Sequence, residues 1–444
     1  MRQQSLVRCI GSRQTVIASA AHICWRPAMA LEGHRVLFIS YNGMIDPLGQ
    51  TQVLPYLREL AKLGVRFTLL SYERHKAFTT EGTKQTSALK QTLADEGIEW
   101  HWLRYHQTPS IPATVYDVIA GTRYASKLVR RNGIEMVHAR SHIPATIALA
   151  LKKRHGLKMI FDVRGLMAEE YVDADHWKKG GLPYRITKTM ERRALTATDA
   201  IVTLTERIWP ILREWEGIKG RDVVHTVIPC CVDLQLFKTN GLERDQIRAR
   251  LGLTDRFTLI YSGSLDGWYL TERMADFFAE YLKTKPTAHL LWLTTGSHSR
   301  VRELMSARNI SSENFSAHSA FASEVPSFLN AADVGVAFIK PCLSKLASSP
   351  TKYGEYLACG LPLVINAGVG DSDALVEEFH VGTLLRTFDA DSYRKAAAEV
   401  EQLSTECDIR ERNRAVAQRL FDLRTVGAKR YAELYELVFQ TTRN

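Results

Sequence analysis

Residues 348–366 read SSPTKYGEYLACGLPLVIN, and this stretch decides the expected fold. Ser349 has the side chain of a good helix N-cap, and Pro350 suits the first helical position, where no N–H is needed. Gly360 is typical of the left-handed residue that follows a helix. Residues 361–366 are apolar and β-branched, which predicts a buried strand. The stretch therefore predicts one αβ unit of a parallel sheet.

Two charged side chains share one face of that helix. Lys352 and Glu355 are three residues apart, and Lys352 falls in the first turn, beside free backbone N–H groups. Such a helix start is an anion site, and we expect a phosphate there, with Ser349 and Thr351 beside it. Glu355 can accept two hydrogen bonds from a sugar diol. The alternative is an exposed Lys–Glu pair on an ordinary helix, which contributes a few tenths of a kcal/mol.

The segment SPTKYGEYLACGLPLV resembles the donor-nucleotide motif of retaining GT-B glycosyltransferases of family 4, also called group 1 glycosyltransferases. In this branch the motif reads S-P-x-K-x-x-E-Y-x-A-x-G-x-P. The resemblance implies an α/β protein of GT-B fold, with two Rossmann-like, doubly wound domains that face each other across a cleft. It also implies that Glu355 binds the nucleotide ribose. The commoner family pattern has another glutamate eight residues earlier, where this chain has Ala347.

Length and composition agree with a multidomain globular protein. A chain of 444 residues is too long for one ordinary domain, and its 45% hydrophobic and 24% charged residues are ordinary values. No apolar run approaches the length that spans a bilayer. The seven cysteines have neither zinc-ligand nor disulfide-framework spacing, which indicates a reducing compartment. We therefore expect a cytoplasmic protein.

The net charge of +10 is unevenly distributed along the chain. Residues 1–230 carry 33 lysines and arginines against 21 acids, whereas residues 231–444 carry 25 against 27. This asymmetry favours a polyanionic partner for the first half. Because no segment resembles a nucleic-acid-binding module, an anionic membrane surface or a phosphorylated acceptor is the expected partner. A scattered, solvated surface charge explains the numbers equally well.

Three boundaries divide the chain. Residues 1–33 contain four arginines and no acid before Glu32, and we expect a disordered leader there. The segment VIPCCVDLQLF at 227–237 resembles the interdomain turn of the family, and the charge balance changes at the same place. We expect an N-terminal Rossmann-like acceptor domain and a C-terminal Rossmann-like nucleotide-sugar domain, followed by a last helix that, by the resemblance, packs back towards the first domain. Their predicted ranges are 34–235, 236–425 and 426–444.

The first half alternates strands and helices, beginning with a strand at 35–40, a helix at 51–63 and a strand at 65–71. Gly49 precedes that helix, and Leu48-Gly49-Gln50 resembles the family's loop that faces the donor phosphates; a tight turn explains the glycine equally well. Ligands of parallel sheets bind beyond the carboxyl ends of strands. The polar residues expected at such ends are His138, Arg140, Ser141, Asp162 and Arg164.

The second half repeats this alternation from a strand at 257–262. Gly263 and Ser264 follow that strand, so their N–H groups could hold a diphosphate oxygen; a tight turn is the alternative. Relatives often have an arginine and a lysine just after this turn, but here only Arg273 is near. The glycine-bearing run at 366–371 could line the same cleft.

The resemblance implies a retaining transfer from a nucleotide sugar. Breaking the C1–O bond leaves new negative charge on the diphosphate, and stabilising that charge is the main catalytic task. Lys352 suits this task, and the segment FDVRGLMAEE resembles a D-x-R-G segment of the branch, which adds Asp162 and Arg164 as catalytic residues. Of the acids in that segment, Glu169 and Glu170 could reach an acceptor.

We expect no cofactor and no metal, because the aspartate pairs at 173/175 and 371/373 read as a solvated loop and a helix cap. The predicted function is a hexosyltransferase that uses a nucleotide-diphosphate sugar and a glycan or lipid-linked acceptor in cell-surface glycoconjugate synthesis. Peripheral contact with the inner face of the membrane fits the basic first half. The alternatives are a non-catalytic nucleotide-sugar-binding protein and a GT-B-like sugar-nucleotide epimerase or phosphorylase.

Overall fold

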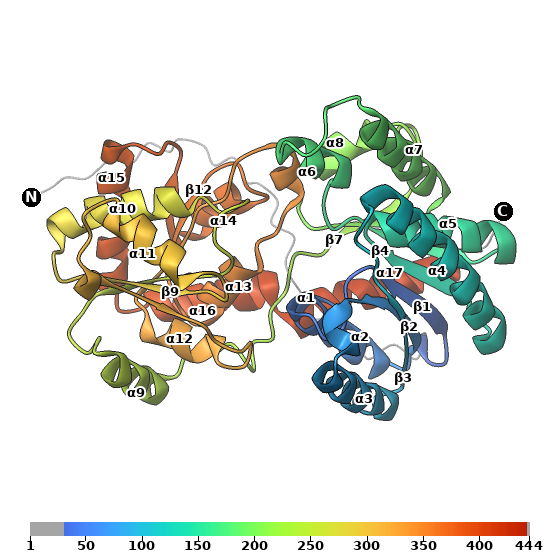
Figure 1. The fold of residues 1–444 in the computed structure, drawn as a ribbon, viewed down its shortest axis with the longest axis horizontal. Coiled ribbons are helices and arrows are strands. Elements are labelled where there is room, and N and C mark those ends of the chain that lie inside the picture. Colours follow the sequence, from blue (N-terminus) through green and yellow to red (C-terminus); the bar gives the residue numbers. More distant parts are fainter. Residues whose placement is uncertain (1–30, 442–444) are drawn as a thin grey trace, which may run out of the picture.

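Two α/β domains lie end to end in the computed structural model, which describes residues 31–441 (Figure 1). The predicted leader at 1–33 therefore lies almost wholly outside the described residues. Leu31, which the prediction assigned to the leader, is fully buried in the first domain's core. The two-domain, doubly wound architecture expected from the sequence is confirmed.

The N-terminal domain is built on a parallel sheet of seven strands, ordered β3-β2-β1-β4-β5-β6-β7. Both faces are covered by helices, so the inner strands are mostly buried, as in other parallel sheets, whereas the edge strands β3 and β7 are partly exposed. Strand order reverses between β1 and β4, which is where ligands of such sheets bind. The strands are β1 (Arg35–Ser40), β2 (Arg66–Glu73), β3 (Ile98–Arg104), β4 (Met136–Arg140), β5 (Lys158–Asp162), β6 (Ala200–Thr203) and β7 (Val224–Val227).

The helices of this domain are α1 (Pro47–Gln52), α2 (Leu54–Ala61), α3 (Thr80–Asp95), α4 (Ser110–Asn132), α5 (His142–His155), α6 (Met167–Asp173), α7 (Leu182–Ala197) and α8 (Trp209–Arg213). The single helix predicted at 51–63 is wrong. The chain breaks at Val53, where ψ is −67° and φ is −127°, because Pro55 lacks the N–H that a continuous helix needs. Helix α3 has no counterpart among the predicted elements.

The C-terminal domain has a six-stranded parallel sheet, ordered β10-β9-β8-β11-β12-β13, with its reversal between β8 and β11. Its strands are β8 (Thr258–Ser262), β9 (His289–Leu293), β10 (Phe315–His318), β11 (Val334–Ala337), β12 (Leu363–Asn366) and β13 (Gly382–Leu385). Its helices are α9 (Gly241–Leu251), α10 (Thr271–Thr284), α11 (His298–Ser306), α12 (Val325–Ala331), α13 (Thr351–Ala358), α14 (Ser372–Phe379), α15 (Ala390–Thr405) and α16 (Ile409–Phe421).

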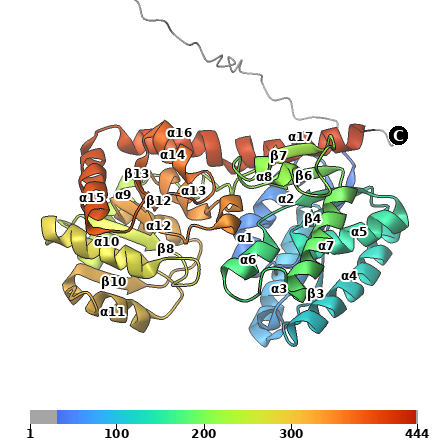
Figure 2. The ribbon, with the colours of Figure 1, turned by 90° about the horizontal axis from the view of Figure 1, so that it is seen from above.

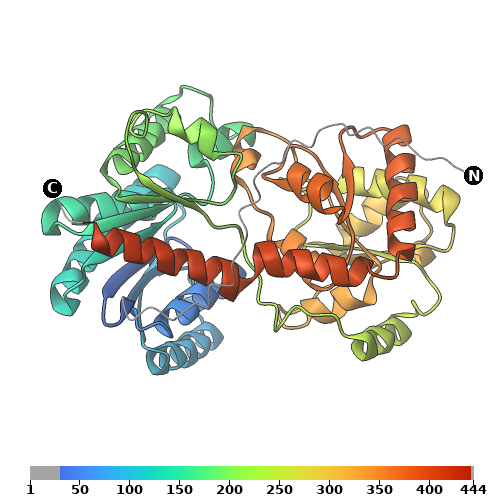
Figure 3. The same ribbon diagram turned by 180° about the vertical axis from the view of Figure 1, so that it is seen from behind.

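A long helical run then crosses from the second domain to the first. After α16, a π-helical turn η5 (Leu423–Ala428) leads into α17 (Lys429–Gln440), which lies along the N-terminal domain (Figure 3). The apolar side of α17 belongs to the core cluster of that domain and is buried there. Beside the crossing, Val232 of the interdomain segment pairs with the backbone on either side of Asp422, so both interdomain connections run together.

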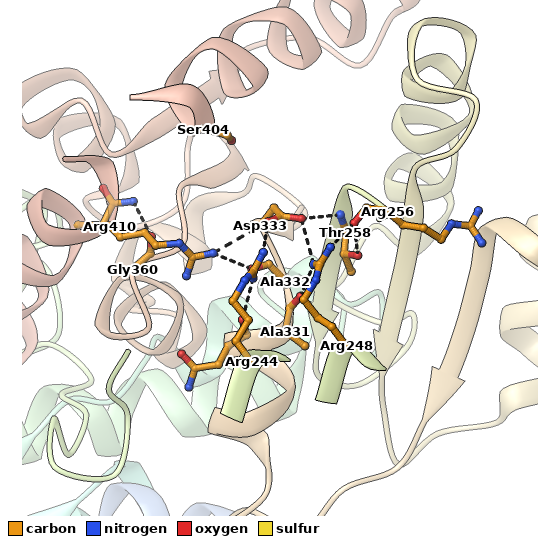
Figure 4. A network of polar contacts seen from close by, with 12 residues as sticks. Arg244, Arg248, Arg256, Thr258, Ala331, Ala332, Asp333, Gly360, Ser404 and Arg410 are labelled. Carbon is orange, nitrogen blue, oxygen red and sulfur yellow. Dashed lines mark hydrogen bonds and ion pairs between the residues drawn. The ribbon is translucent and has the colours of Figure 1, made fainter. Parts of the chain in front are cut away.

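An arginine cluster closes the far end of the second sheet (Figure 4). Arg244 and Arg248 donate to carbonyls at the end of α12 and both pair with Asp333, at 2.6 and 3.4 Å. Arg410 also donates to one of these carbonyls, at 3.0 Å. Positive charge at a helix C-terminus interacts favourably with the negative end of the helix dipole. The cluster therefore fixes α12 and the strands beside it, and these arginines are structural.

Candidate functional site

A cavity of about 380 Å³ lies between the domains, at the carboxyl ends of both sheets. The first domain contributes Asn42 after β1, Arg140 and Ser141 at the end of β4, and Arg164 after β5. The second domain contributes residues that follow β8 and β11 and the residues that lead into α13. These are Trp268, Tyr269, Ile339, Lys345, Ser348, Ser349, Pro350 and Thr351.

Helix α13 begins at this cavity, one residue later than predicted. Its first residue is Thr351, with Pro350 at the N-cap, and no side chain caps it. Ser349 was predicted as the cap, which is wrong, because its Oγ accepts from the Cys230 N–H of the interdomain segment at 3.1 Å. Ser349, Pro350 and Thr351 instead line the cavity, so the amino end of α13 points at it.

Lys352 is the most unusual side chain of the site. It is only 6% exposed, and its Nζ has no hydrogen-bond partner within residues 31–441. The ammonium lies 3.5 Å from the ring centre of Tyr269 and 4.7 Å from that of Tyr261. Burial lowers the pKa of Lys352 to about 7, and Glu355 opposes this shift. A buried ammonium at the positive end of a helix is stabilised by an anion, and no side chain among residues 31–441 supplies one in contact.

The turn after β8 is shaped by this lysine. Gly263 has φ +147°, and a Cβ there would lie 2.8 Å from Lys352 Nζ, so a side chain would displace the ammonium. The predicted phosphate role of the Gly263 N–H is not available in this structure, since that group donates to the Leu293 carbonyl at 3.0 Å. The carbonyl of Ser264 accepts from the Tyr261 hydroxyl. Gly263 thus makes room for the cation, and its N–H is already used in a hydrogen bond within the second domain.

Glu355 lies one turn further along α13 and is partly exposed. Burial raises the pKa of its carboxyl to about 7, and the neighbouring Lys352 opposes this shift. The folded protein therefore holds this proton more tightly than the unfolded chain, whose carboxyl titrates near 4.5. Stability from this group is fully present below pH 4.5 and is lost as the pH rises through 7.

We expect Glu355→Gln, which imitates the protonated carboxyl, to match the wild type near pH 4.5 and to exceed it by about 1–2 kcal/mol above pH 7. Urea unfolding at a series of pH values measures this difference. Glu303→Gln on α11, where the carboxylate is 66% exposed, is the matched control and should show no pH-dependent gain. A constant difference between Glu355→Gln and wild type at all pH values would contradict the shift.

Arg164 lines the cavity from the first domain, and Asp162 lies beneath it. Asp162 accepts from the Tyr431 hydroxyl of α17 at 2.8 Å, and its Oδ2 is 3.8 Å from Arg164 Nη1 and 3.5 Å from His138 Nε2. Burial alone would raise the pKa of Asp162, but Arg164 and His138 hold it below its usual value. Arg164 thus remains charged at the cavity, while Asp162 is a buried support for it.

Two further charged residues were not predicted to bind the donor or to catalyse. Lys345, in the 3₁₀ turn η4 (Leu343–Ala347), is 3.1 Å from Glu170 Oε1 of α6 and 3.9 Å from the Trp268 ring centre. Arg140 reaches Asn42 Oδ1 at 3.1 Å, and burial and the nearby Arg164 lower its pKa to about 10. With Arg164, these residues give the cavity three cations against the single carboxylate of Glu170. No spacing in the sequence marks Lys345.

Of the two predicted acceptor carboxylates, only Glu170 lines the interdomain cavity. Glu169 instead lines a neighbouring cavity, formed by the first domain and Leu343, where it lies 3.1 Å from Lys188 and accepts from the Tyr184 hydroxyl at 3.3 Å. An acceptor in the interdomain cavity would therefore meet Glu170.

Other predicted residues lie outside this cavity. Gly49 is inside α1, where a Cβ would meet the Gly43 carbonyl oxygen at 2.2 Å, so the glycine allows backbone packing. Arg273 is an exposed residue of α10 whose nearest acid is Asp276, at 3.5 Å. Gly370 packs on Ser348, whose carbonyl oxygen would be 2.1 Å from a Cβ. The glycine-bearing run at 366–371 therefore packs against Ser348, which lines the cavity, and does not line the cavity itself.

Polar contacts join the domains around the cavity. Asp371 is the N-cap residue of α14, as predicted, but its carboxylate does not cap the helix and instead accepts from the N–H groups of Glu206 and Arg207 at 2.9 and 3.1 Å. Asp173 is likewise no solvated loop residue, since it accepts from the Ser344 N–H at 3.0 Å. Ala347 is buried against the apolar core of the first domain. A glutamate at this position would place a charge in that interface.

Within residues 31–441, no group of three or more His, Cys, Asp or Glu side chains is arranged to hold a metal ion. In the same part of the chain, no helix is long and apolar enough to cross a membrane.

Comparisons with known proteins agree with this architecture. Residues 49–236 match the sequence model described as Glycosyltransferase Family 4. Sucrose-phosphate synthase from Thermosynechococcus elongatus superimposes with a TM-score of 0.67 at 16% identity, covering 92% of this chain and 100% of its own. HepE from Anabaena, in complex with UDP and glucose, gives 0.65 at 15% identity, with coverage of 90% and 99%.

WaaG, a glycosyltransferase involved in lipopolysaccharide biosynthesis, gives a TM-score of 0.64 at 14% identity, with coverage of 90% of this chain and 99% of its own. A sequence comparison with curated proteins finds no significant match. The structural likenesses show the fold, and the sequence match gives the family of the first domain. The chain therefore has the GT-B fold of these glycosyltransferases, and the match to family 4 covers residues 49–236.

Proposed function

We propose that the protein transfers a hexosyl group from a nucleotide-diphosphate sugar to a glycan or lipid-linked acceptor with retention of anomeric configuration. The observation that carries this proposal is the buried, unpartnered ammonium of Lys352 beside a helix start and a cationic cavity. The complexes of HepE with UDP and with UDP-glucose support a nucleotide-sugar donor. The role of WaaG in lipopolysaccharide biosynthesis supports a lipid-linked acceptor and a part in cell-surface glycoconjugate synthesis.

In this proposal the diphosphate lies between the two domains. The residues at the amino end of α13 hold it from one side, next to Lys352, whose ammonium contacts Tyr269 of the cavity wall, and Arg164 reaches it from the other side. Binding of the anion raises the pKa of Lys352 again, because an opposite charge favours the ammonium. Glu355, one turn along α13, accepts hydrogen bonds from the ribose hydroxyls.

The same groups then act on the reaction. As the C1–O bond breaks, negative charge grows on the leaving diphosphate, and preorganised cations stabilise this charge more than the charge of the intact donor. Retention requires the acceptor oxygen to bond to C1 on the face that the diphosphate leaves. Because Lys352, Arg164 and Lys345 supply positive charge, we expect transfer to persist in the presence of EDTA.

A screen of UDP-, GDP- and ADP-sugars by thermal stabilisation identifies the donor, since a ligand at a hundredfold its Kd adds about 2.7 kcal/mol. The stabilising donor, radiolabelled in its sugar, is then incubated with cell-envelope lipid extracts and oligosaccharides. A labelled acceptor whose new linkage has the donor's anomeric configuration by NMR supports the proposal. Stabilisation without transfer to any acceptor would instead indicate a binding protein, and conversion of the donor without acceptor an epimerase.

A further inference from the structure

Lys352 and Glu355 of α13 are placed to form an ion pair, yet they do not form one. They are three residues apart on one helix, so their side chains are neighbours. Burial lowers the pKa of Lys352 and raises that of Glu355, and each side chain opposes the shift of the other. The ammonium nevertheless has no hydrogen-bond partner within residues 31–441, so no hydrogen bond joins it to the carboxylate. Another contact therefore holds the lysine.

Two tyrosine rings hold the ammonium instead. Its Nζ lies 3.5 Å from the ring centre of Tyr269 and 4.7 Å from that of Tyr261. The two rings meet edge to face, with their centres 5.9 Å apart. A cation is attracted to the negative face of an aromatic ring, but the ring carries no net charge. The rings therefore hold the cation and do not neutralise it.

Tyr269 is the ring with a place in the site. Tyr261 belongs to β8, is fully buried in the core, and donates its hydroxyl to the Ser264 carbonyl, so it has a packing role as well. Tyr269 is half-buried and lines the interdomain cavity. The backbone on either side of Tyr269 is bonded to the segment that follows β11, by two hydrogen bonds of 2.9 Å. The sheet therefore sets the position of this ring.

The ring keeps the ammonium next to the cavity. Helix α13 lies on the side of the second domain that faces the first domain (Figure 2). Residues 349–351 at its start line the cavity together with Tyr269. Gly263 closes the space around the ammonium, since a Cβ there would lie 2.8 Å from Nζ. If the lysine paired with Glu355 instead, the two charges would cancel, and the positive charge beside the cavity would be lost.

We propose that Tyr269 is a positioning residue for the donor, because its ring face holds the Lys352 ammonium next to the cavity and prevents an ion pair with Glu355. The cation then stays available for the diphosphate, and the carboxyl stays available for the ribose. A carboxylate in place of the ring would hold the cation as firmly but would neutralise it. The inference rests on the proposed function and deepens it, since it names the residue that keeps two donor-binding groups apart.

Urea unfolding of the ligand-free full chain above pH 7 tests the separation directly. In the wild type, Glu355→Gln should raise the unfolding midpoint, since burial raises the pKa of the carboxyl to about 7 and so disfavours its charge. In the Tyr269→Leu background the same substitution should lower the midpoint, because it breaks a buried ion pair. In the Tyr269→Phe background, which keeps the ring face, the midpoint should rise as in the wild type. A change of the same sign in all three backgrounds overturns the proposal.

Pyrophosphate then tests what the separation is for. It has the diphosphate but no ribose, so the expected ribose contacts of Glu355 do not enter. By thermal stabilisation, Tyr269→Leu should weaken pyrophosphate binding roughly tenfold or more, because a charge-assisted contact is lost, and Tyr269→Phe should stay within about threefold of wild type. Glu355→Gln should strengthen binding more in the Tyr269→Leu background than in the wild type, because only there does it release the lysine from a pair.

Phe78→Leu is the matched control. It removes another ring that faces a cation, Arg104 at 5.2 Å, and Phe78 is 41% exposed in the first domain. This variant should change neither measurement. If the sign change at Glu355 appears but pyrophosphate does not stabilise the wild type, the separation by Tyr269 stands and the proposed function fails. If Tyr269→Leu binds pyrophosphate like wild type, the positioning role is wrong and the proposed function stands.

Discussion

Replacing Lys352 by methionine should make the ligand-free protein more stable and abolish its stabilisation by the nucleoside diphosphate of the donor. Methionine keeps the apolar stem but removes a buried ammonium that no side chain of residues 31–441 contacts by a hydrogen bond. Since the folded pKa is about 7 and the unfolded value is 10.5, the wild type is penalised fully below pH 7. The penalty vanishes as the pH rises towards 10.5.

We therefore expect Lys352→Met to gain roughly 2–4 kcal/mol at or below pH 7 and to lose this advantage at high pH. Thermal unfolding with and without UDP, GDP or ADP measures both effects in one experiment. Lys395→Met, at a position that is 80% exposed, should change neither the midpoint nor the response to ligand. A destabilised Lys352→Met that still responds to the same nucleotide would show that the ammonium is not an anion site.

Replacing Arg164 by alanine should lower kcat by roughly 100- to 1,000-fold while changing the donor KM much less. The guanidinium reaches the cavity from the first domain, so its contact with the diphosphate tightens as negative charge grows there. Arg164→Lys should recover part of the rate, because an ammonium keeps the charge but not the forked geometry. Initial rates with the donor found in the screen measure these changes.

The stability of Arg164→Ala needs its own control, because the change leaves Asp162 buried without its cation. The double variant Arg164→Ala/Asp162→Asn removes that charge and should recover thermal stability without recovering kcat. If the double variant regains both, Arg164 acts only in folding. A fall in kcat/KM of Arg164→Ala with kcat unchanged would indicate that Arg164 only binds the donor.

The sequence predicted the alternation of strands and helices well, because buried parallel strands are short apolar runs that few other structures produce. It also placed Lys352, Thr351 and Glu355 together, since residues three or four positions apart on one helix are neighbours in any fold. The break at Val53 was missed although Pro55 marks it, because the apolar periodicity continues through the proline. Helix α3 was missed because its weakly apolar sequence has few buried residues.

The residue roles that the sequence did not predict depend on contacts between residues that are far apart in the chain. Lys345 becomes a cavity residue only because α6 of the other domain brings Glu170 to it. Gly263 is explained by the position of a lysine 89 residues later in the chain, which no local pattern indicates. Ser349 loses its capping role to the backbone of Cys230, again from far away in the sequence. Local patterns thus predict elements, whereas contacts between elements decide the roles of single side chains.

The crossing helix has a consequence for how the protein is made. A ribosome releases the N-terminal domain first, yet Tyr431, Leu434, Tyr435 and Val438 of α17 belong to that domain's core. Asp162 likewise receives the Tyr431 hydroxyl only after residue 431 has been synthesised. The nascent first domain therefore exposes an apolar groove until the second domain and α17 have been synthesised.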